Sequence, residues 1–182
     1  MTEKISPFSN IFSFFGADDF SLQRKVDHWK TEFAKKYSAS AVTVVNAGSL
    51  TESEIISQLQ THLSPSLFAS KKLIIVRDGL PTKATQTQLA DYLLSALDQV
   101  PKDFFIIFWS SQKPDGRLGF TKKFHGKVTV TEFDLPHGAV LNQWIKAMVK
   151  TQGAAITDRA TEKLGAFLGR DLYEEKNRTD NC

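Results

Sequence analysis

Apolar and polar residues alternate in two different patterns along this chain. In the first pattern, short and nearly continuous apolar runs, rich in β-branched and aromatic residues, alternate with turn residues and polar stretches. Runs of this length are typical of strands that are buried on both faces of a sheet. The pattern predicts a five-stranded sheet formed by Ile11–Gly16, Ala41–Asn46, Leu73–Val76, Asp103–Trp109 and Lys127–Phe133.

In the second pattern, apolar residues recur every three or four positions, which is the period of an amphipathic helix. Asp18 or Asp19 can cap the first such segment, and Thr51 with Glu54 forms a capping box at the start of the second, which ends before Pro65. Two further helices are expected around Leu89–Val100 and Leu118–Phe124. Strands that alternate with helices predict a parallel sheet covered on both faces.

The pattern changes near Leu135 and Pro136. Beyond this point the apolar residues mark two helices, one through Leu141, Trp144, Ile145 and Met148 and one through Ile156, Leu164, Phe167 and Leu168. A polar tail follows. We expect an α/β domain over residues 1–135 and a small, incomplete helical unit over residues 136–182.

Composition narrows the class of protein only slightly. The 41% hydrophobic and 24% charged residues are ordinary for a globular protein, and a net charge of +3 permits contact with nucleic acid without requiring it. The one cysteine, Cys182, leaves no internal disulfide, which fits a reducing compartment. Without a signal peptide or an apolar run of membrane-spanning length, we expect a soluble, cytoplasmic protein.

The turn after the first strand is where a nucleotide-binding P-loop would lie. Against the pattern GxxxxGK[ST], the chain keeps Gly16 but has Ser21, Leu22 and Gln23 where glycine, lysine and a hydroxyl residue are needed. At the end of the third strand, where a carboxylate pair would help to hold Mg²⁺, there is the lone Asp78. We therefore expect a degenerate P-loop, no catalytic residue, no cofactor and no hydrolysis, with nucleotide binding as an alternative.

Three acids suggest another alternative. Asp18, Asp19 and Asp78 follow the first and third strands, as the acids of a phospho-accepting receiver domain do, and Ser110 follows the fourth. The lysine that a receiver needs after the fifth strand is missing, since Glu132–Leu135 occupies that position. The structural alternative is that Asp18 and Asp19 cap a helix and that Asp78 begins a turn.

Basic residues gather between Gln112 and Lys127. The set consists of Lys113, Arg117, Lys122, Lys123 and Lys127, with a single acid among them. Such a cluster can contact nucleic-acid phosphates, and a solvated helix face explains it equally well. No metal site is expected, because the four histidines are scattered along the chain at His28, His62, His125 and His137.

The stretch LSPSLFASKKLIIVRD, from Leu63 to Asp78, contains an unusual apolar pair. Leu67 and Phe68 lie among small polar residues, directly before the third predicted strand and outside any helical or strand period. Such a pair often anchors a loop to its own domain. It can also be presented to a partner protein.

Four segments in this order resemble the bacterial DNA polymerase III delta subunit family, the clamp-loader wrench, from about Ile11 to Tyr173. They are FSFFGADDFSLQRKV, VVNAGSLTESEIISQLQTHLSPSLFASKKLIIVRD, PKDFFIIFWSS and FLGRDLYE. The most specific part is SLFASKKLIIVRD, because family members carry a Leu-Phe pair just before the third strand. GRDL, at Gly169–Leu172, is similar to the family's turn in the helical lid.

The resemblance implies an AAA+-like fold, related to P-loop NTPases, that does not hydrolyse ATP. Tyr173 stands where an ATPase relative has a sensor arginine. The resemblance also implies that Leu67 and Phe68 plug a hydrophobic pocket of the ring-shaped sliding clamp and help to open the ring, with Pro65 and Ser66 shaping the loop. The protein would then serve DNA replication.

The resemblance implies further that the chain is not an enzyme by itself. It would be a subunit of a DNA polymerase III holoenzyme whose nucleotidyltransferase activity resides in another subunit. Its partners would be the sliding clamp, the other clamp-loader subunits in the full-length protein and primer–template DNA, with no membrane. The family's third domain, a helical collar, is not matched, so we expect an N-terminal portion that keeps clamp binding and loses assembly into the loader.

Overall fold

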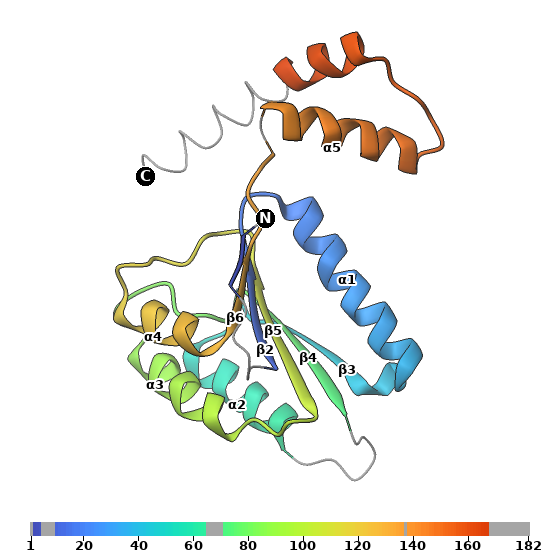
Figure 1. Cartoon of the computed structure of the whole chain (residues 1–182). Helices are drawn as coiled ribbons and strands as arrows, with labels where there is room; N and C mark the ends of the chain where they lie inside the picture. The colour runs from blue at the N-terminus through green and yellow to red at the C-terminus, as the bar shows by residue number, and fades with distance from the viewer. Residues whose placement is uncertain (1, 5–9, 65–70, 137, 168–182) are drawn as a thin grey trace. The chain divides into compact units, whose positions relative to one another are not determined.

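The computed structural model describes residues 2–4, 10–64, 71–136 and 138–167. The chain forms two compact units, Met1–Asp134 and Leu135–Cys182. The first is an α/β domain, drawn in Figure 1. Its strands are β1 (Thr2–Lys4), β2 (Ile11–Phe15), β3 (Val42–Asn46), β4 (Lys72–Arg77), β5 (Phe104–Ser110) and β6 (Thr129–Glu132). Its α-helices are α1 (Asp19–Lys36), α2 (Glu52–Leu63), α3 (Thr87–Ala96) and α4 (Gly119–Lys127).

The six strands form one sheet in the order β1-β6-β2-β5-β4-β3. The five strands β2 to β6 pair in parallel, which confirms the predicted five-stranded parallel sheet. The strand β1 was not predicted, and it adds to the edge of the sheet by pairing antiparallel with β6, Thr2 opposite Glu132. Two short 3₁₀ helices, Ala39–Ala41 and Leu97–Gln99, precede β3 and follow α3.

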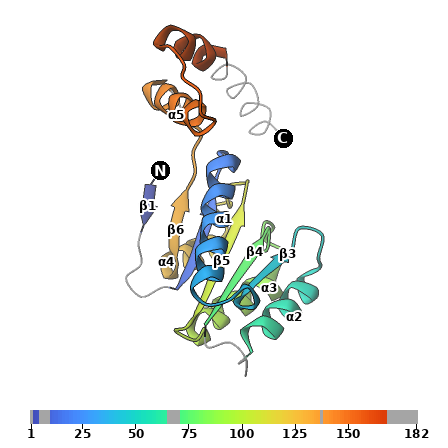
Figure 2. The ribbon, with the colours of Figure 1, turned by 90° about the vertical axis from the view of Figure 1, so that its right-hand side faces the viewer.

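The helices cover both faces of the sheet, as predicted. Figures 1 and 2 show α1 alone on one face and α2, α3 and α4 together on the other. This division follows from the right-handed crossover between parallel strands. The connection from β2 to the edge strand β3, which contains α1, crosses the sheet in one direction. The later connections, from β3 through β4 and β5 to β6, cross the sheet in the opposite direction, so their helices α2, α3 and α4 lie on the opposite face.

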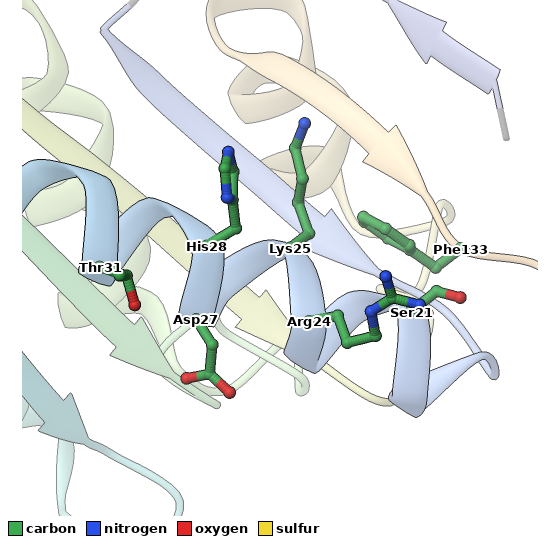
Figure 3. A pocket seen from close by; sticks show the side chains of 7 residues that line it. All are labelled: Ser21, Arg24, Lys25, Asp27, His28, Thr31 and Phe133. Carbon is green, nitrogen blue, oxygen red and sulfur yellow. The ribbon is translucent and has the colours of Figure 1, made fainter. Parts of the chain in front are cut away.

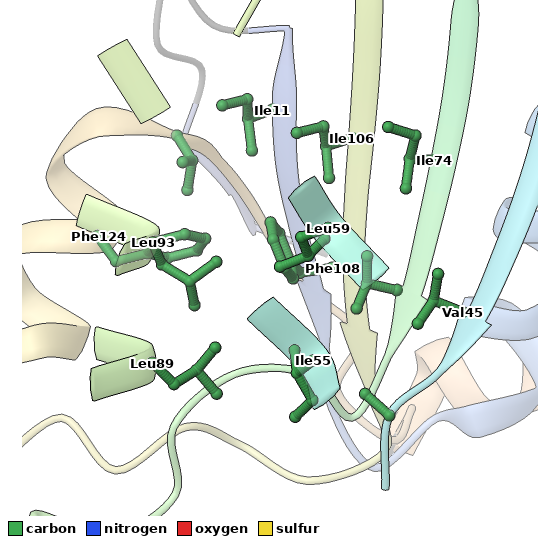
Figure 4. Close-up of a cluster of buried hydrophobic side chains, with 13 residues drawn as sticks. Ile11, Val45, Ile55, Leu59, Ile74, Leu89, Leu93, Ile106, Phe108 and Phe124 are labelled. Atoms are coloured by element: carbon green, nitrogen blue, oxygen red, sulfur yellow. The ribbon is translucent and has the colours of Figure 1, made fainter. Parts of the chain in front are cut away.

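Alternate residues of the central strands belong to two separate cores. Leu73 and Ile75 of β4 pack under α1, whereas Ile74 and Val76 pack under α2 and α3. The second of these cores, with Phe108 and Phe124 in edge-to-face contact at 5.5 Å between ring centroids, is drawn in Figure 4. Burial on both sides explains why these strands are continuously apolar in the sequence.

Both predicted helix caps are present. Asp18 is the N-cap of α1, and its Oδ1 accepts a hydrogen bond from the backbone N–H of Ser21 at 3.0 Å. Thr51 and Glu54 form the capping box of α2, in which Glu54 Oε2 accepts from the Thr51 backbone N–H at 2.8 Å. These contacts satisfy N–H groups that a helix leaves unpaired at its start.

The capping box makes the stability of α2 depend on pH. The backbone N–H and the hydroxyl of Thr51 donate to the Glu54 carboxylate, and this lowers the pKa of Glu54 below its ordinary value of 4.5. Because the pKa is lowered on folding, the stabilisation is present above that ordinary value and is lost as the pH falls through the folded-state pKa. Glu54→Gln removes the titration and keeps an acceptor. We expect the difference in melting temperature between wild type and Glu54→Gln to shrink from pH 7 to pH 3; a constant difference would contradict this account.

The second unit contains α5 (Gly138–Thr151) and a helix over residues 158–167. Leu141 and Ile145 of α5 are buried, and Lys146 Nζ lies 2.5 Å from Asp158 Oδ1. The predicted apolar face of the second helix is partly wrong. Ile156 precedes the helix, Leu164 and Phe167 are exposed, and the buried positions are Thr161 and Gly165. Leu168 lies outside the described residues.

Among the described residues, no helix combines the length and the hydropathy that crossing a bilayer requires.

Candidate functional site

The predicted clamp-binding residues Pro65, Ser66, Leu67 and Phe68 lie outside the described residues. The structure does describe the two elements that they connect, α2 and β4. The strand β4 lies between β3 and β5 in the sheet, and Leu73–Val76 are fully buried. Residues 65–70 therefore lead directly into one of the best packed strands of the domain.

Lys72 ties the end of α2 to the beginning of β4. Its Nζ donates to the carbonyl oxygens of His62 at 3.2 Å and Ser64 at 2.8 Å, and it lies 4.9 Å from the centre of the Phe104 ring. The last carbonyls of a helix have no partner within the helix, so a lysine placed there satisfies them. Partial burial lowers the pKa of His62, and the positive charge of Lys72 lowers it further. Both ends of the 65–70 segment are thus joined by side-chain contacts.

Lys71, the residue that follows the segment, has partners from two other elements. Its Nζ lies 2.6 Å from Asp103 Oδ1, and this hydrogen bond raises the pKa of the lysine. The same Nζ lies 5.8 Å from the centre of the Tyr37 ring at the end of α1. Sequence reasoning missed Tyr37, Lys72 and Asp103, because no local pattern joins residues as far apart as Lys71 and Asp103.

The residues of the degenerate P-loop do not form a phosphate cradle. Gly16 has a φ of +140° and its N–H donates to Ser110 O at 3.3 Å, while the N–H of Asp18 donates to Phe133 O at 2.9 Å. A P-loop instead points its backbone N–H groups at the phosphates. Ser21, Leu22 and Gln23 are part of α1, where Leu22 is fully buried and Gln23 Nε2 donates to Asp27 at 3.1 Å.

The three acids of the receiver interpretation have separate structural partners. Asp18 caps α1, Asp19 accepts a hydrogen bond from Ser111 Oγ at 2.7 Å, and Asp78, in the left-handed region with a φ of +54°, lies 3.5 Å from the guanidinium of Arg77. Within the described part of the chain, no three His, Cys, Asp or Glu side chains are grouped to hold a metal ion.

The strand order separates this fold from a receiver domain. In the receiver order, 2-1-3-4-5, the first and third parallel strands are neighbours. In this sheet β5 lies between β2 and β4, so the turns that carry Asp18 and Asp78 do not follow adjacent strands. The receiver interpretation is therefore wrong.

The basic cluster lies on α4 and on the connection that precedes it. Three of its members are ion-paired: Lys113 with Glu132, Arg117 with Asp115 and Lys127 with Asp98, at 2.5, 2.9 and 2.7 Å. Lys122 and Lys123 are exposed on α4, and among the described residues neither takes part in an ion pair within 4 Å. Three cations of the predicted cluster are therefore paired with acids, and Lys122 and Lys123 are the members whose charge has no ion-pair partner among the described residues.

A shallow, open depression of about 570 Å³ lies along α1, and sequence reasoning did not predict it. It is lined by Ser21, Arg24, Lys25, Asp27, His28, Thr31 and Phe133. Figure 3 shows Lys25 and His28 on one side of the helix and Asp27 on the other. The basic side chains favour anions, and Asp27 is also 3.6 Å from Lys30.

Comparison with solved structures supports an AAA+-like fold. A Bacillus subtilis DNA clamp loader delta protein matches with a TM-score of 0.55 and 14% identity over 86% of this chain and 47% of its own. An AMPPCP-bound DnaA from Aquifex aeolicus matches with a TM-score of 0.52 and 16% identity over 88% of this chain and 50% of its own. The chain therefore spans about half the length of these proteins. At such low identities the likeness concerns the fold.

Sequence comparison gives the family. A search of curated proteins finds no match. A family model described as DNA polymerase III, delta subunit, matches residues 12–134, which is more than half of the chain and includes nearly the whole α/β domain. This chain therefore belongs to the DNA polymerase III delta subunit family.

Proposed function

We propose that this protein binds a sliding clamp through Leu67 and Phe68 and helps to open the clamp for loading onto DNA during replication. The observation that carries the proposal is the position of the pair in a delta-family chain. The pair falls between α2 and the buried strand β4, whose facing ends Lys72 joins by hydrogen bonds to His62 O and Ser64 O. These hydrogen bonds hold the end of α2 beside the start of β4, on either side of the pair in the sequence.

The chemistry of the pair suits such a role. Burial of a leucine or a phenylalanine side chain in a partner's pocket contributes about 1.5–3 kcal/mol each, enough for a two-residue hot spot. Affinity alone does not open a ring. The pair and its surroundings must bind the open clamp more tightly than the closed clamp, because only differential binding shifts a conformational equilibrium.

We also propose that the chain hydrolyses no ATP and that this reaction belongs to partner subunits of a clamp loader. The N–H groups of Gly16 and Asp18 donate to backbone carbonyls, and Leu22 occupies the position of the P-loop lysine. Assembly with those subunits in the cytoplasm, and with a polymerase that carries the nucleotidyltransferase activity, is the proposed setting. A nucleotide-binding role would instead raise the melting temperature in millimolar ATP.

The proposal is tested by equilibrium binding of the whole chain to the sliding clamp of the same organism, measured calorimetrically. We expect saturable binding, and tighter binding to a clamp variant whose ring interface is weakened than to the closed ring. Equal affinity for both clamps would remove ring opening from the proposal. The absence of binding by a chain whose circular dichroism and cooperative melting show it to be folded would overturn the clamp-binding function itself.

A contact with primer–template DNA is favoured by Lys122 and Lys123, which are exposed and have no ion pair within 4 Å in the part of the chain that the structure describes. We expect Lys122→Ala with Lys123→Ala to weaken DNA binding and to reduce the slope of log affinity against log salt by about 1.8, since each phosphate contact contributes about 0.9. The matched control is Lys113→Ala with Arg117→Ala, whose cations are already paired with acids. DNA affinity is measured by fluorescence anisotropy over a salt series. Equal losses of affinity in the two variants would contradict a specific contact by Lys122 and Lys123 and would indicate only a general attraction between positive charge and DNA.

A further inference from the structure

The end of α1 carries an exposed aromatic residue beside the start of β4. Tyr37 is 38% exposed and lies next to the last residue of α1, whereas Phe33, one turn earlier on the same helix, is buried. Lys36 Nζ and Lys71 Nζ lie 5.5 and 5.8 Å from the centre of the tyrosine ring. We call Tyr37, Lys36 and Lys71 the tyrosine patch.

The patch is held in place before any partner binds. The Tyr37 ring lies 4.6 Å from the Phe33 ring, which in turn makes an edge contact with Phe105 of β5 at 5.8 Å. The N–H of Tyr37 donates to Phe33 O at 3.0 Å, and Lys71 is fixed by Asp103 at 2.6 Å. A side chain that is already ordered loses little entropy on binding, and tyrosine is among the residues most enriched in interface hot spots.

The position of Lys71 connects the patch to residues 65–70. Phe68 is three residues before Lys71, and three residues of extended chain span at most about 11 Å. A surface that receives the Phe68 side chain must therefore come close to Lys71, whose ammonium group lies over Tyr37. This limit comes from chain length alone, whatever conformation the intervening residues adopt.

Two side chains are too small to form the whole interface. A stable protein–protein interface covers about 800 Å² on each partner, whereas one large aromatic side chain buries about 150–250 Å². The partner that takes Leu67 and Phe68 must therefore cover neighbouring surface, and the tyrosine patch offers it an aromatic ring with cations above it.

We propose that the tyrosine patch is a second contact to the sliding clamp, which adds to the Leu67–Phe68 contact. The inference rests on the clamp-binding function proposed above. The clamp surface that fits the patch is an apolar rim with a carboxylate, because Tyr37 offers a partly exposed aromatic ring and Lys36 an ammonium group that has no ion pair within 4 Å among the described residues.

The chain offers a closely matched control at the other end of the same helix. Phe20 is 44% exposed, and the Arg24 guanidinium lies 5.6 Å from its ring centre, so it is also an exposed aromatic residue with a cation over it. Phe20 lies in the first turn of α1, close to the carboxyl ends of the parallel strands. In contrast, residues 65–70 precede the amino end of β4 in the sequence.

The test measures clamp binding by wild type, Tyr37→Ala, Phe20→Ala and Leu67→Ala/Phe68→Ala. We expect about tenfold weaker binding for Tyr37→Ala and less than a twofold change for Phe20→Ala. If Tyr37→Ala binds within twofold of wild type while the Leu67/Phe68 variant fails, the patch inference is wrong and the proposed function stands. If wild type itself does not bind, both are overturned.

A second measurement on the unaltered protein removes any dependence on how Tyr37→Ala folds. In hydroxyl-radical footprinting of the wild-type chain with and without clamp, we expect oxidation of Tyr37 to fall severalfold in the complex and oxidation of Phe20 to stay the same. Unchanged oxidation of Tyr37 in a saturated complex would exclude the patch from the interface.

Discussion

Replacing Leu67 and Phe68 together with alanine is expected to weaken clamp binding at least about a hundredfold. The two side chains contribute about 3–6 kcal/mol if both are buried in the partner, and 1.4 kcal/mol corresponds to a tenfold change in affinity. The melting temperature of the isolated chain should change by no more than a few degrees if the pair serves the partner's pocket, as proposed, and not the protein's own core. Calorimetric titration and thermal unfolding of the same preparations provide both quantities.

The control for this variant is Phe20→Ala with Val44→Ala. These two side chains are each 44% exposed, on α1 and β3, so the control removes exposed apolar surface and leaves the sequence of residues 65–70 unchanged. It should bind the clamp like wild type. The contrary result is a large fall in the melting temperature of the Leu67/Phe68 variant, which would assign the pair to the protein's own core and favour the loop-anchoring interpretation.

Gly16→Ala is expected to destabilise the α/β domain by about 3 kcal/mol or more, because two penalties act at one position. A Cβ there would lie 2.2 Å from the carbonyl oxygen of Phe133, and that backbone is held by hydrogen bonds from Phe133 N to Phe15 O and from Asp18 N to Phe133 O. The φ of +140° is also a conformation that residues with a side chain rarely adopt. Urea denaturation, followed by circular dichroism, measures the loss as a lower midpoint at unchanged slope.

Gly116→Ala is the matched control for this prediction, since no atom lies within 4 Å of a Cβ built there. Its midpoint should remain close to that of wild type. The Gly16 turn follows the carboxyl end of β2, whereas the pair precedes the amino end of the parallel strand β4, at the opposite end of the strands. The fraction of Gly16→Ala that stays folded should therefore bind the clamp with normal affinity. A Gly16→Ala protein as stable as wild type would show that the turn can rearrange.

Much of the α/β domain could be predicted from the sequence, and the exceptions are instructive. The strands β2, β4 and β5 were found because burial on both faces makes them almost continuously apolar, whereas β3 and β6 were found from short runs of β-branched residues. The strand β1 was missed because Thr2–Lys4 is short and polar and is recognised as a strand only through its pairing with β6. In the second unit, Leu164 and Phe167 were placed on a buried face by their spacing, yet Phe167 is 76% exposed.

The candidate site shows the same division. The Leu67–Phe68 pair stood out in the sequence because it broke every local period, and the family resemblance supplied a role for it. Lys72, Tyr37 and Asp103 did not stand out, because each acts through a contact with another element of the fold. The basic cluster was visible as composition, but only the ion pairs with Glu132, Asp115 and Asp98 separated Lys122 and Lys123 from the rest.

The sequence by itself determined which segments become strands and helices, where α1 and α2 begin, and that the P-loop residues are missing. These features depend on burial period and on side chains within one helical turn, so neighbours in the chain are sufficient to encode them. Only the tertiary structure decided the strand order, which excludes a receiver domain, and the contacts of Lys72 with the end of α2 and of Tyr37 with Lys71. Those outcomes depend on contacts between distant segments, whose free energy arises only when the whole domain packs together.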